Sequence, residues 1–141
     1  MNTTLRYAFF GTGPLAESVL AALVRGGYVP ELVVTKPDAP QGRHMIITPP
    51  TIKTWAEMKH ISVYQPESLK DLPSDSPLHE EEYDVFIVAS YGKMIPDDIL
   101  ALPKKGVLNV HPSLLPKYRG PSPIESALLD FPMSNNSKAS S

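Results

Sequence analysis

Apolar residues along this chain follow two patterns that predict different elements. Short continuous apolar runs are typical of buried strands, and apolar residues spaced three or four apart are typical of amphipathic helices. The expected strands are residues 7–10, 32–34, 61–64, 85–89 and 107–111. Strands separated by helical segments predict a Rossmann-like α/β fold, with a doubly wound, mostly parallel sheet.

The helical segments lie between these strands and after the last of them. The first spans the apolar positions of residues 15–23 and is closed by Gly26–Gly27. A second covers residues 52–56, and residues 96–102 form at most two helical turns. A last helix begins at Ser122, where a serine cap is followed by proline and then by a glutamate that completes a capping box.

Size and composition narrow the possibilities. The 141 residues suit one domain, which we expect over residues 1–130, followed by a small, polar and disordered tail over residues 131–141. The sequence has no cysteine, which excludes disulfides and thiolate metal sites. Its histidines lack metal-ligand spacing, so we expect no metal site. They are His44, His60, His79 and His111.

The expected cellular location and the expected classes of partner follow from features that the sequence lacks. No apolar run is long enough to span a membrane, and the first residues lead directly into a strand, so we expect no membrane partner. We expect a cytoplasmic protein, or an organellar matrix protein in a eukaryote, although no transit peptide is visible. The net charge of −2 argues against a protein that coats nucleic acid by charge alone.

Several cations follow the expected strands, although the net charge is negative. These residues are Lys36, Arg43, Lys93, Lys117 and Arg119. In an open parallel sheet, ligands bind at the carboxyl edge, where such residues lie. The sequence therefore predicts a basic rim that could receive an anionic ligand.

The end of the last expected strand carries two chemically active side chains. Successive strand residues point to opposite faces, so Asn109 and His111 share one face while Leu108 and Val110 share the other. A hydrogen-bond donor and an acid/base group therefore stand together where the strand ends. Prolines beyond the strand restrict the following loop, which suits ligand binding.

This segment resembles a known family. The run from Asn109 to Gly120, which reads NVHPSLLPKYRG, is similar to the signature of the folate-dependent formyltransferases. These enzymes move a formyl group from 10-formyltetrahydrofolate to an amine. The resemblance implies that Asn109 donates to the oxyanion of the tetrahedral intermediate and that His111 stabilises it and moves protons. It also implies a folate site lined by Ser113, Leu114, Leu115 and Pro116.

The turn after the strand at residues 85–89 resembles the folate-binding turn of the same family. It comprises Tyr91, Gly92, Lys93, Met94 and Ile95. The resemblance implies that backbone groups of this turn pair with the flat pterin ring. Met94 and Ile95 would add apolar contact.

The segment over residues 35–43 has no periodic apolar pattern and begins a long connection, which predicts either a functional loop or a mobile surface loop. It is similar to the loop with which methionyl-tRNA formyltransferases enter the acceptor end of initiator tRNA. The matching positions are Pro37, Asp38, Pro40, Gly42, Arg43 and Thr48-Pro49-Pro50.

The resemblance implies initiator methionyl-tRNA as the substrate, bound through Lys36, Arg43 and Arg119. His44-Met45-Ile46 stands where lysines commonly follow the arginine, which predicts fewer phosphate contacts and a shallower salt dependence.

Two alternatives stay open. The family's third catalytic group, an aspartate, would fall beyond Ser141, so the chain is truncated relative to the family domain and could be a catalytically incomplete folate- or RNA-binding fragment. Residues 11–16 also fit the glycine pattern of a dinucleotide-binding module. No acidic residue closes the second strand, however, which favours a purely structural role for these glycines.

The family resemblance also predicts how the sheet continues. Further strands would pack beyond the one at residues 107–111, so ending at Ser141 would leave an uncovered sheet edge. Unpaired edges favour association, and we therefore expect self-association of the isolated chain.

Overall fold

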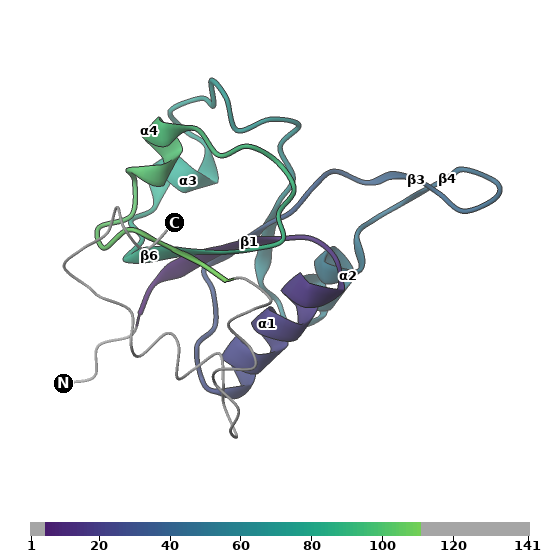
Figure 1. The fold of residues 1–141 in the computed structure, drawn as a ribbon, viewed down its shortest axis with the longest axis horizontal. Helices are drawn as coiled ribbons and strands as arrows, with labels where there is room; N and C mark the ends of the chain where they lie inside the picture. Colours follow the sequence, from purple (N-terminus) through teal and green to yellow (C-terminus); the bar gives the residue numbers. More distant parts are fainter. Residues whose placement is uncertain (1–4, 111–141) are drawn as a thin grey trace.

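The computed structural model describes residues 5–110, which form a parallel sheet with helices on both faces (Figure 1). The sheet has five strands in the order β5-β2-β1-β6-β7, and every neighbouring pair is parallel. The strands are β1 (Tyr7–Gly11), β2 (Leu32–Val34), β5 (Ser62–Tyr64), β6 (Val85–Ala89) and β7 (Val107–Asn109). The Rossmann-like, doubly wound fold expected from the apolar pattern is confirmed.

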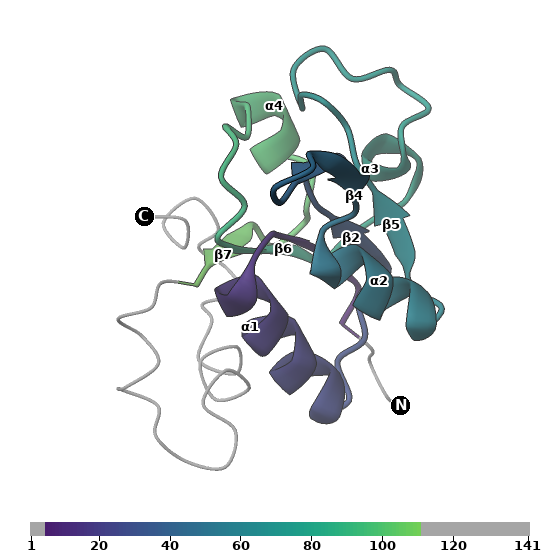
Figure 2. The same ribbon diagram turned by 90° about the vertical axis from the view of Figure 1, so that its right-hand side faces the viewer.

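The helices form one layer on each side of the sheet (Figure 2). One layer holds α1 (Pro14–Arg25) and α2 (Thr51–Met58), whose buried side chains share a core cluster. The opposite layer holds the short helices α3 (Pro77–Glu80) and α4 (Asp97–Leu100). The sequence pattern predicted α1, α2 and α4 but not α3.

The central strands β1 and β6 are buried on both faces, as their continuous apolar sequences require. Along β1, Tyr7 and Phe9 join the core cluster beneath α1 and α2, whereas Phe10 joins the cluster beneath α3 and α4. In the second cluster the ring of Phe10 lies 4.9 Å from that of Phe86, centroid to centroid. The two cores are therefore built by alternate residues of the same strands.

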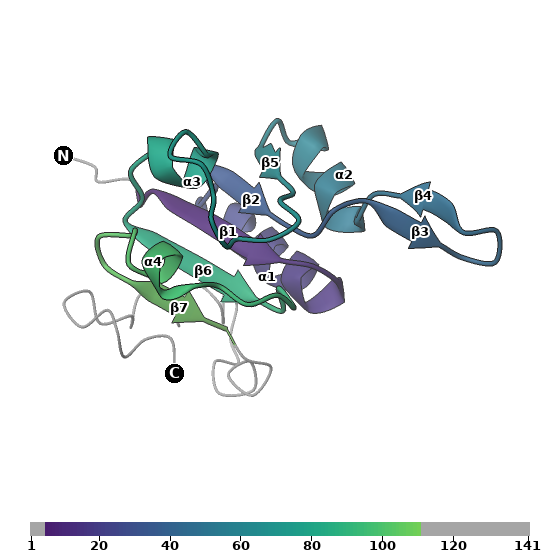
Figure 3. The ribbon, with the colours of Figure 1, turned by 90° about the horizontal axis from the view of Figure 1, so that it is seen from above.

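The segment expected to be an unpatterned loop is in part a β-hairpin, which corrects that expectation. Strands β3 (Ala39–Gln41) and β4 (Ile46–Thr48) pair antiparallel and project from the body of the molecule (Figure 3). We call the hairpin at residues 39–48 the arm. Its strands were missed because they are short and solvent-exposed, so no core selects alternating apolar residues.

Three expected strand boundaries also shift, the first at β1, which ends at Gly11 rather than at Phe10. Strand β5 begins one residue later than predicted, and β7 ends at Asn109, although the amide of Val110 still donates to the carbonyl of Val88 at 2.8 Å. Leu108 and Val110 both pack with the cluster beneath α1 and α2, as alternation predicts. The expected helix from Ser122 and the polar tail lie outside the described residues.

Candidate ligand site at the carboxyl edge of the sheet

A pocket of about 410 Å³ lies at the point in the sheet where the order of the strands reverses. From β1 the chain continues to β2 and β5 on one side, while β6 and β7 extend the other side. The turns after β1 and β6 therefore diverge, and such a switch point is where α/β proteins bind ligands. The pocket is lined by Thr12, Gly13, Lys36, Ser90, Tyr91, Gly92 and Lys93.

The turn from β1 into α1 depends on two glycines for different reasons. A Cβ on Gly11 would stand 2.5 Å from the carbonyl oxygen of Ala89 and 2.6 Å from the Cβ of Ala16. Gly13 has φ 97° and ψ −179°, a region that is essentially restricted to glycine. Close packing and backbone conformation thus explain both residues without a bound dinucleotide.

The turn after β6 presents mainly backbone to the pocket. Ser90 has φ 59° and Gly92 has φ 85°, so the chain reverses through two left-handed residues. The amide of Thr12 donates to the carbonyl of Ser90 at 3.0 Å and joins the two turns. A left-handed non-glycine residue is uncommon and is often found at functional sites.

Tyr91 points its ring into the core, although the resemblance places this residue at the folate site. Its side chain is buried and packs edge-on against Phe10, with ring centroids 5.7 Å apart. Among the described residues its hydroxyl has no hydrogen-bond partner, and burial raises the pKa of that hydroxyl to about 12. What Tyr91 can offer a ligand in this conformation is therefore its backbone.

The other residues expected in this turn differ in exposure. Lys93 lines the pocket, and its ammonium group donates to the carbonyl of Glu67 at 3.1 Å. Met94 is 84% exposed, one of the most exposed large apolar side chains of the described chain. Ile95 is partly buried against the cluster beneath α3 and α4.

The structure separates the cations that were expected to form one basic rim. Lys36 follows β2 and, with Lys93, lines the pocket. Arg43 instead lies between β3 and β4 in the exposed turn of the arm, away from the body of the sheet (Figure 3). The expectation of a rim that includes Arg43 is wrong, because the arm carries this residue outward before the chain returns to α2.

Asn109 lies at the end of β7, one strand away from the switch point. It is opposite Val88 in the ladder, and Val88 is opposite Phe10 of β1. Asn109 is partly buried, and its row of the ladder, shared with Val88, lies two residues before the pocket-lining turn that starts at Ser90. Its backbone position thus brings an amide side chain to the same edge of the sheet as the pocket.

The remaining expected site residues lie outside the described residues. These are His111, Ser113, Leu114, Leu115, Pro116 and Arg119. Sequence reasoning did not select Thr12, Thr35 or Ser90, which line or support the pocket. Thr35 is fully buried, and its hydroxyl lies 2.8 Å from that of Thr12. Their position directly after buried strands is the signal that could have identified them.

Residues 5–110 offer neither a metal site nor a membrane-spanning helix. Over this range, no group of three or more His, Asp or Glu side chains is arranged to hold a metal ion. None of the helices in the same range has the length and apolar character needed to cross a membrane.

Comparison with known families agrees with this geometry. The Formyl transferase family matches residues 5–130, and the chain belongs to that family. The resemblance recognised in the sequence is therefore confirmed.

The curated relatives described here carry a more specific name. The methionyl-tRNA formyltransferase of Halalkalibacterium halodurans is 42% identical over 126 residues, which cover 89% of this chain and 40% of the relative. The methionyl-tRNA formyltransferase of Thermotoga neapolitana is 46% identical over 124 residues, or 88% of this chain and 40% of the relative. The chain thus spans about 40% of the length of these relatives.

Solved structures share the fold at lower sequence identity. The glycinamide ribonucleotide transformylase 1 of Geobacillus kaustophilus has a TM-score of 0.54 and 22% identity, and the match covers 91% of this chain and 69% of that one. The phosphoribosylglycinamide formyltransferase of Anaplasma phagocytophilum has a TM-score of 0.56 and 21% identity, with 91% and 59% coverage. These matches concern the fold, which formyltransferases with different substrates share.

Proposed function

We propose that this chain is part of a protein that transfers the formyl group of 10-formyltetrahydrofolate to the amino group of methionyl-tRNA. The observation that carries the proposal is a carboxyl-edge pocket at the switch point of a formyltransferase-family sheet. The relatives described above, which match 88–89% of the chain, are named methionyl-tRNA formyltransferases. The proposal includes a role in translation initiation and a cytoplasmic location.

The pocket suits the folate donor in size and in chemistry. Its volume of about 410 Å³ lies within the ordinary range for small-molecule sites. The left-handed turns at Ser90 and Gly92 expose backbone groups, which can pair with the polar edge of a pterin ring. Lys93 offers a cation near the pocket for an anionic part of the ligand. 10-Formyltetrahydrofolate would supply the formyl carbon.

Asn109 and His111 carry the proposed chemistry of the chain. An amine that attacks a formyl carbon forms a bond to it and drives negative charge onto the formyl oxygen. The Asn109 side-chain amide would donate to that oxygen, which typically contributes about 2.7–4 kcal/mol in the transition state. His111 would take the proton released by the amine and return one to the departing nitrogen, since its ordinary pKa is about 6.5.

The arm supports tRNA as the acceptor over a small metabolite. It projects from the body and carries Arg43 at its exposed turn, while Lys36 remains at the pocket. Long acceptors such as RNA need contacts beyond the reaction centre, and cations are the usual partners of phosphate. Met45 and Ile46 are exposed beside Arg43, so the arm offers apolar as well as charged contact.

Isothermal titration of the chain with 5-formyltetrahydrofolate, a stable isomer of the donor, tests folate binding. We expect saturable heat that is lost in Asn109→Ala and retained in Ser62→Ala, which alters the opposite edge of the sheet. A folded sample that gives no heat would remove folate from the proposal.

Transfer of labelled formyl groups to methionyl-tRNA tests the acceptor. We expect turnover by the chain to be slow, because it spans only about 40% of the length of the relatives described above. Folate binding without any binding of methionyl-tRNA would favour the alternative, a folate-binding fragment.

A further inference from the structure

Within residues 5–110, the side-chain contacts that join the arm to the body lie at its base. Its strands β3 and β4 are largely exposed, and neither contributes a residue to the two core clusters of the described chain. Hydrophobic packing therefore does not set the direction in which the arm projects (Figure 3). The contacts around residues 35–38 and 51 must do so.

Asp38 is the centre of the contacts at the entry to the arm. Its Oδ1 atom accepts a hydrogen bond from Gln65 Nε2 at 2.7 Å, and Lys53 Nζ lies 3.3 and 3.4 Å from its two carboxylate oxygens. Gln65 Nε2 also donates to the carbonyl of Lys36 at 3.1 Å. One carboxylate thus links the arm to the end of β5 and to α2.

Other contacts hold the chain before Asp38 and after the arm, but none of them involves the side chains at the entry to the arm. The amide of Thr35 donates to the carbonyl of Tyr64 at 3.0 Å, which ends the pairing with the sheet. On the outgoing side, the hydroxyl of Thr51 donates to the carboxylate of Glu17. Between Thr35 and β3, Asp38 is the residue whose side chain reaches across to the body.

The Asp38 carboxylate is charged in this arrangement. The hydrogen bond from Gln65 and the nearby Lys53 ammonium hold the pKa of Asp38 below its ordinary value. The side chains of Asp38 and Lys53 are partly exposed, at 35% and 22%. Each contact is individually weak in such surroundings, but the arm has few others.

We propose that Asp38 is a positioning residue that, through Gln65 and Lys53, sets the direction of the arm relative to the carboxyl-edge pocket. The consequence for RNA rests on the proposed function: an arm that carries Arg43 must point correctly for an acceptor bound there to reach the pocket. If the correctly directed population falls to about one tenth, the apparent Kd for that acceptor rises about tenfold.

Distance measurement between two spin labels tests the direction of the arm without any ligand. The sequence has no cysteine, so His44→Cys in the arm and Ser18→Cys on α1 create two unique labelling sites, both exposed. We expect a narrow distance distribution in the otherwise unchanged chain. Asp38→Ala should broaden it, since the contacts to Gln65 and Lys53 are lost.

Two variants separate positioning from a general loss of structure. Asp38→Asn keeps an oxygen that accepts from Gln65 but removes the charge facing Lys53, so its distribution should be intermediate. Glu57→Gln removes an exposed carboxylate elsewhere on α2 and should leave the distribution unchanged. A broad distribution in the parent chain, or an equally narrow one in Asp38→Ala, would overturn the proposal.

Binding measurements connect the arm to the acceptor. We expect Asp38→Ala to weaken binding of methionyl-tRNA about tenfold while the affinity for 5-formyltetrahydrofolate stays the same. Equal loss of both affinities would contradict a positioning role and indicate a disturbed pocket. If the parent chain binds no tRNA, the proposed function fails, but the spin-label distances still decide whether Asp38 directs the arm.

Discussion

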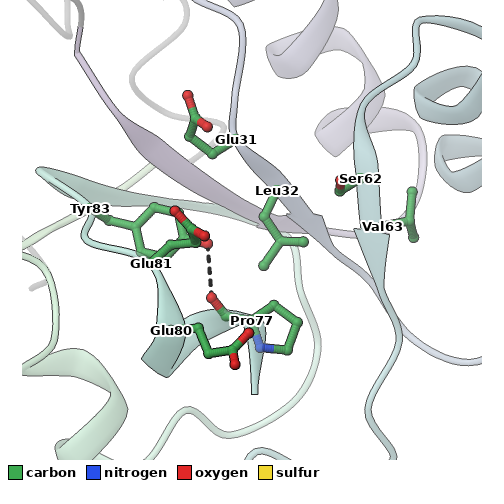
Figure 4. Close-up of a pocket in the computed structure, with 8 residues that line it drawn as sticks. All are labelled: Glu31, Leu32, Ser62, Val63, Pro77, Glu80, Glu81 and Tyr83. Atoms are coloured by element: carbon green, nitrogen blue, oxygen red, sulfur yellow. Dashed lines mark hydrogen bonds between the residues drawn. The ribbon is translucent and has the colours of Figure 1, made fainter. Parts of the chain in front are cut away.

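Pockets of similar size lie at opposite edges of the sheet, and their chemistry differs. The carboxyl-edge pocket has a volume of about 410 Å³, and the amino-edge pocket has about 360 Å³. Figure 4 shows the amino-edge pocket, where the side chains of Glu31, Glu80 and Glu81 lie beside the apolar side chains of Leu32 and Pro77. Size alone therefore does not identify a ligand site in this molecule.

The polar groups of the amino edge are largely engaged with one another. Arg6 bonds to Glu31 at 3.5 Å and to Glu81 at 3.1 Å, and the Tyr83 hydroxyl donates to the carbonyl of Pro77 at 3.1 Å (Figure 4). The carboxyl edge instead combines glycine turns with lysines. The two edges therefore differ in charge: the amino edge gathers carboxylates, two of them paired with Arg6, whereas the carboxyl edge gathers lysines.

Replacing Gly11 should have the largest effect on stability, because the carboxyl edge depends on close backbone approach there. In Gly11→Ala the new Cβ would overlap the carbonyl of Ala89 and the side chain of Ala16. We expect a loss of about 3 kcal/mol in the free energy of unfolding, measured by urea titration. Gly42→Ala in the arm, where nothing lies within 4 Å, should cost only about 1 kcal/mol. Equal losses would contradict the close approach.

Alkaline pH should destabilise the fold through a buried tyrosine at each edge. Burial raises the pKa of both Tyr83 and Tyr91 to about 12, above the ordinary value of about 10 in the unfolded chain. Their contribution to stability is thus complete below pH about 10 and is lost as the pH rises through about 12. Urea midpoints should therefore fall as the pH rises from about 10 towards about 12, and less so in the double variant Tyr83→Phe/Tyr91→Phe. A pH-independent midpoint would show that these hydroxyls are hydrated.

The same tyrosines should respond differently to removal of the hydroxyl. Tyr83→Phe leaves the carbonyl of Pro77 without its donor and should cost about 1 kcal/mol. Tyr91→Phe removes a buried hydroxyl that has no partner among the described residues, so stability should be unchanged or higher. Thermal unfolding of the two single variants distinguishes them. A clear loss in Tyr91→Phe would mean that its hydroxyl bonds to a group beyond residues 5–110.

Arg6→Gln should have the smallest effect. The guanidinium and its two carboxylate partners are exposed, and water screens such pairs. We expect a slight decrease in the urea midpoint at low salt that disappears at high salt. A large loss that persists at high salt would mean that these contacts hold the amino edge more firmly than their exposure indicates.

The sequence predicted the sheet better than the arm or the site. Continuous apolar runs such as Val85–Ala89 identify strands buried on both faces, because few other environments favour them. The arm has no core, and Pro40 in β3 argues against a strand, so its hairpin left no apolar pattern. The helix at Pro77–Glu80 had a usable signal in the Ser76 cap followed by proline.

Site residues were harder to predict because the role of each depends on the direction in which its side chain points. Nothing in the sequence distinguishes a tyrosine that faces a ligand from one, such as Tyr91, that packs on Phe10. Thr12 and Thr35 support the pocket through a hydroxyl contact between residues 23 positions apart, which only the fold brings together. Lys36 and Lys93 could be predicted, since they come two and four residues after the ends of recognisable strands.

The most direct test of the difference between the edges is an amide chemical-shift titration of the isotope-labelled chain with 5-formyltetrahydrofolate. We predict that saturable shifts centre on the carboxyl-edge turns, at Thr12, Gly13, Ser90 and Gly92, while the amides at the amino edge stay unchanged. The amino-edge amides to follow are those of Leu32, Ser62 and Glu80. Shifts centred on the amino-edge residues, or none at either edge in a folded sample, would contradict this prediction.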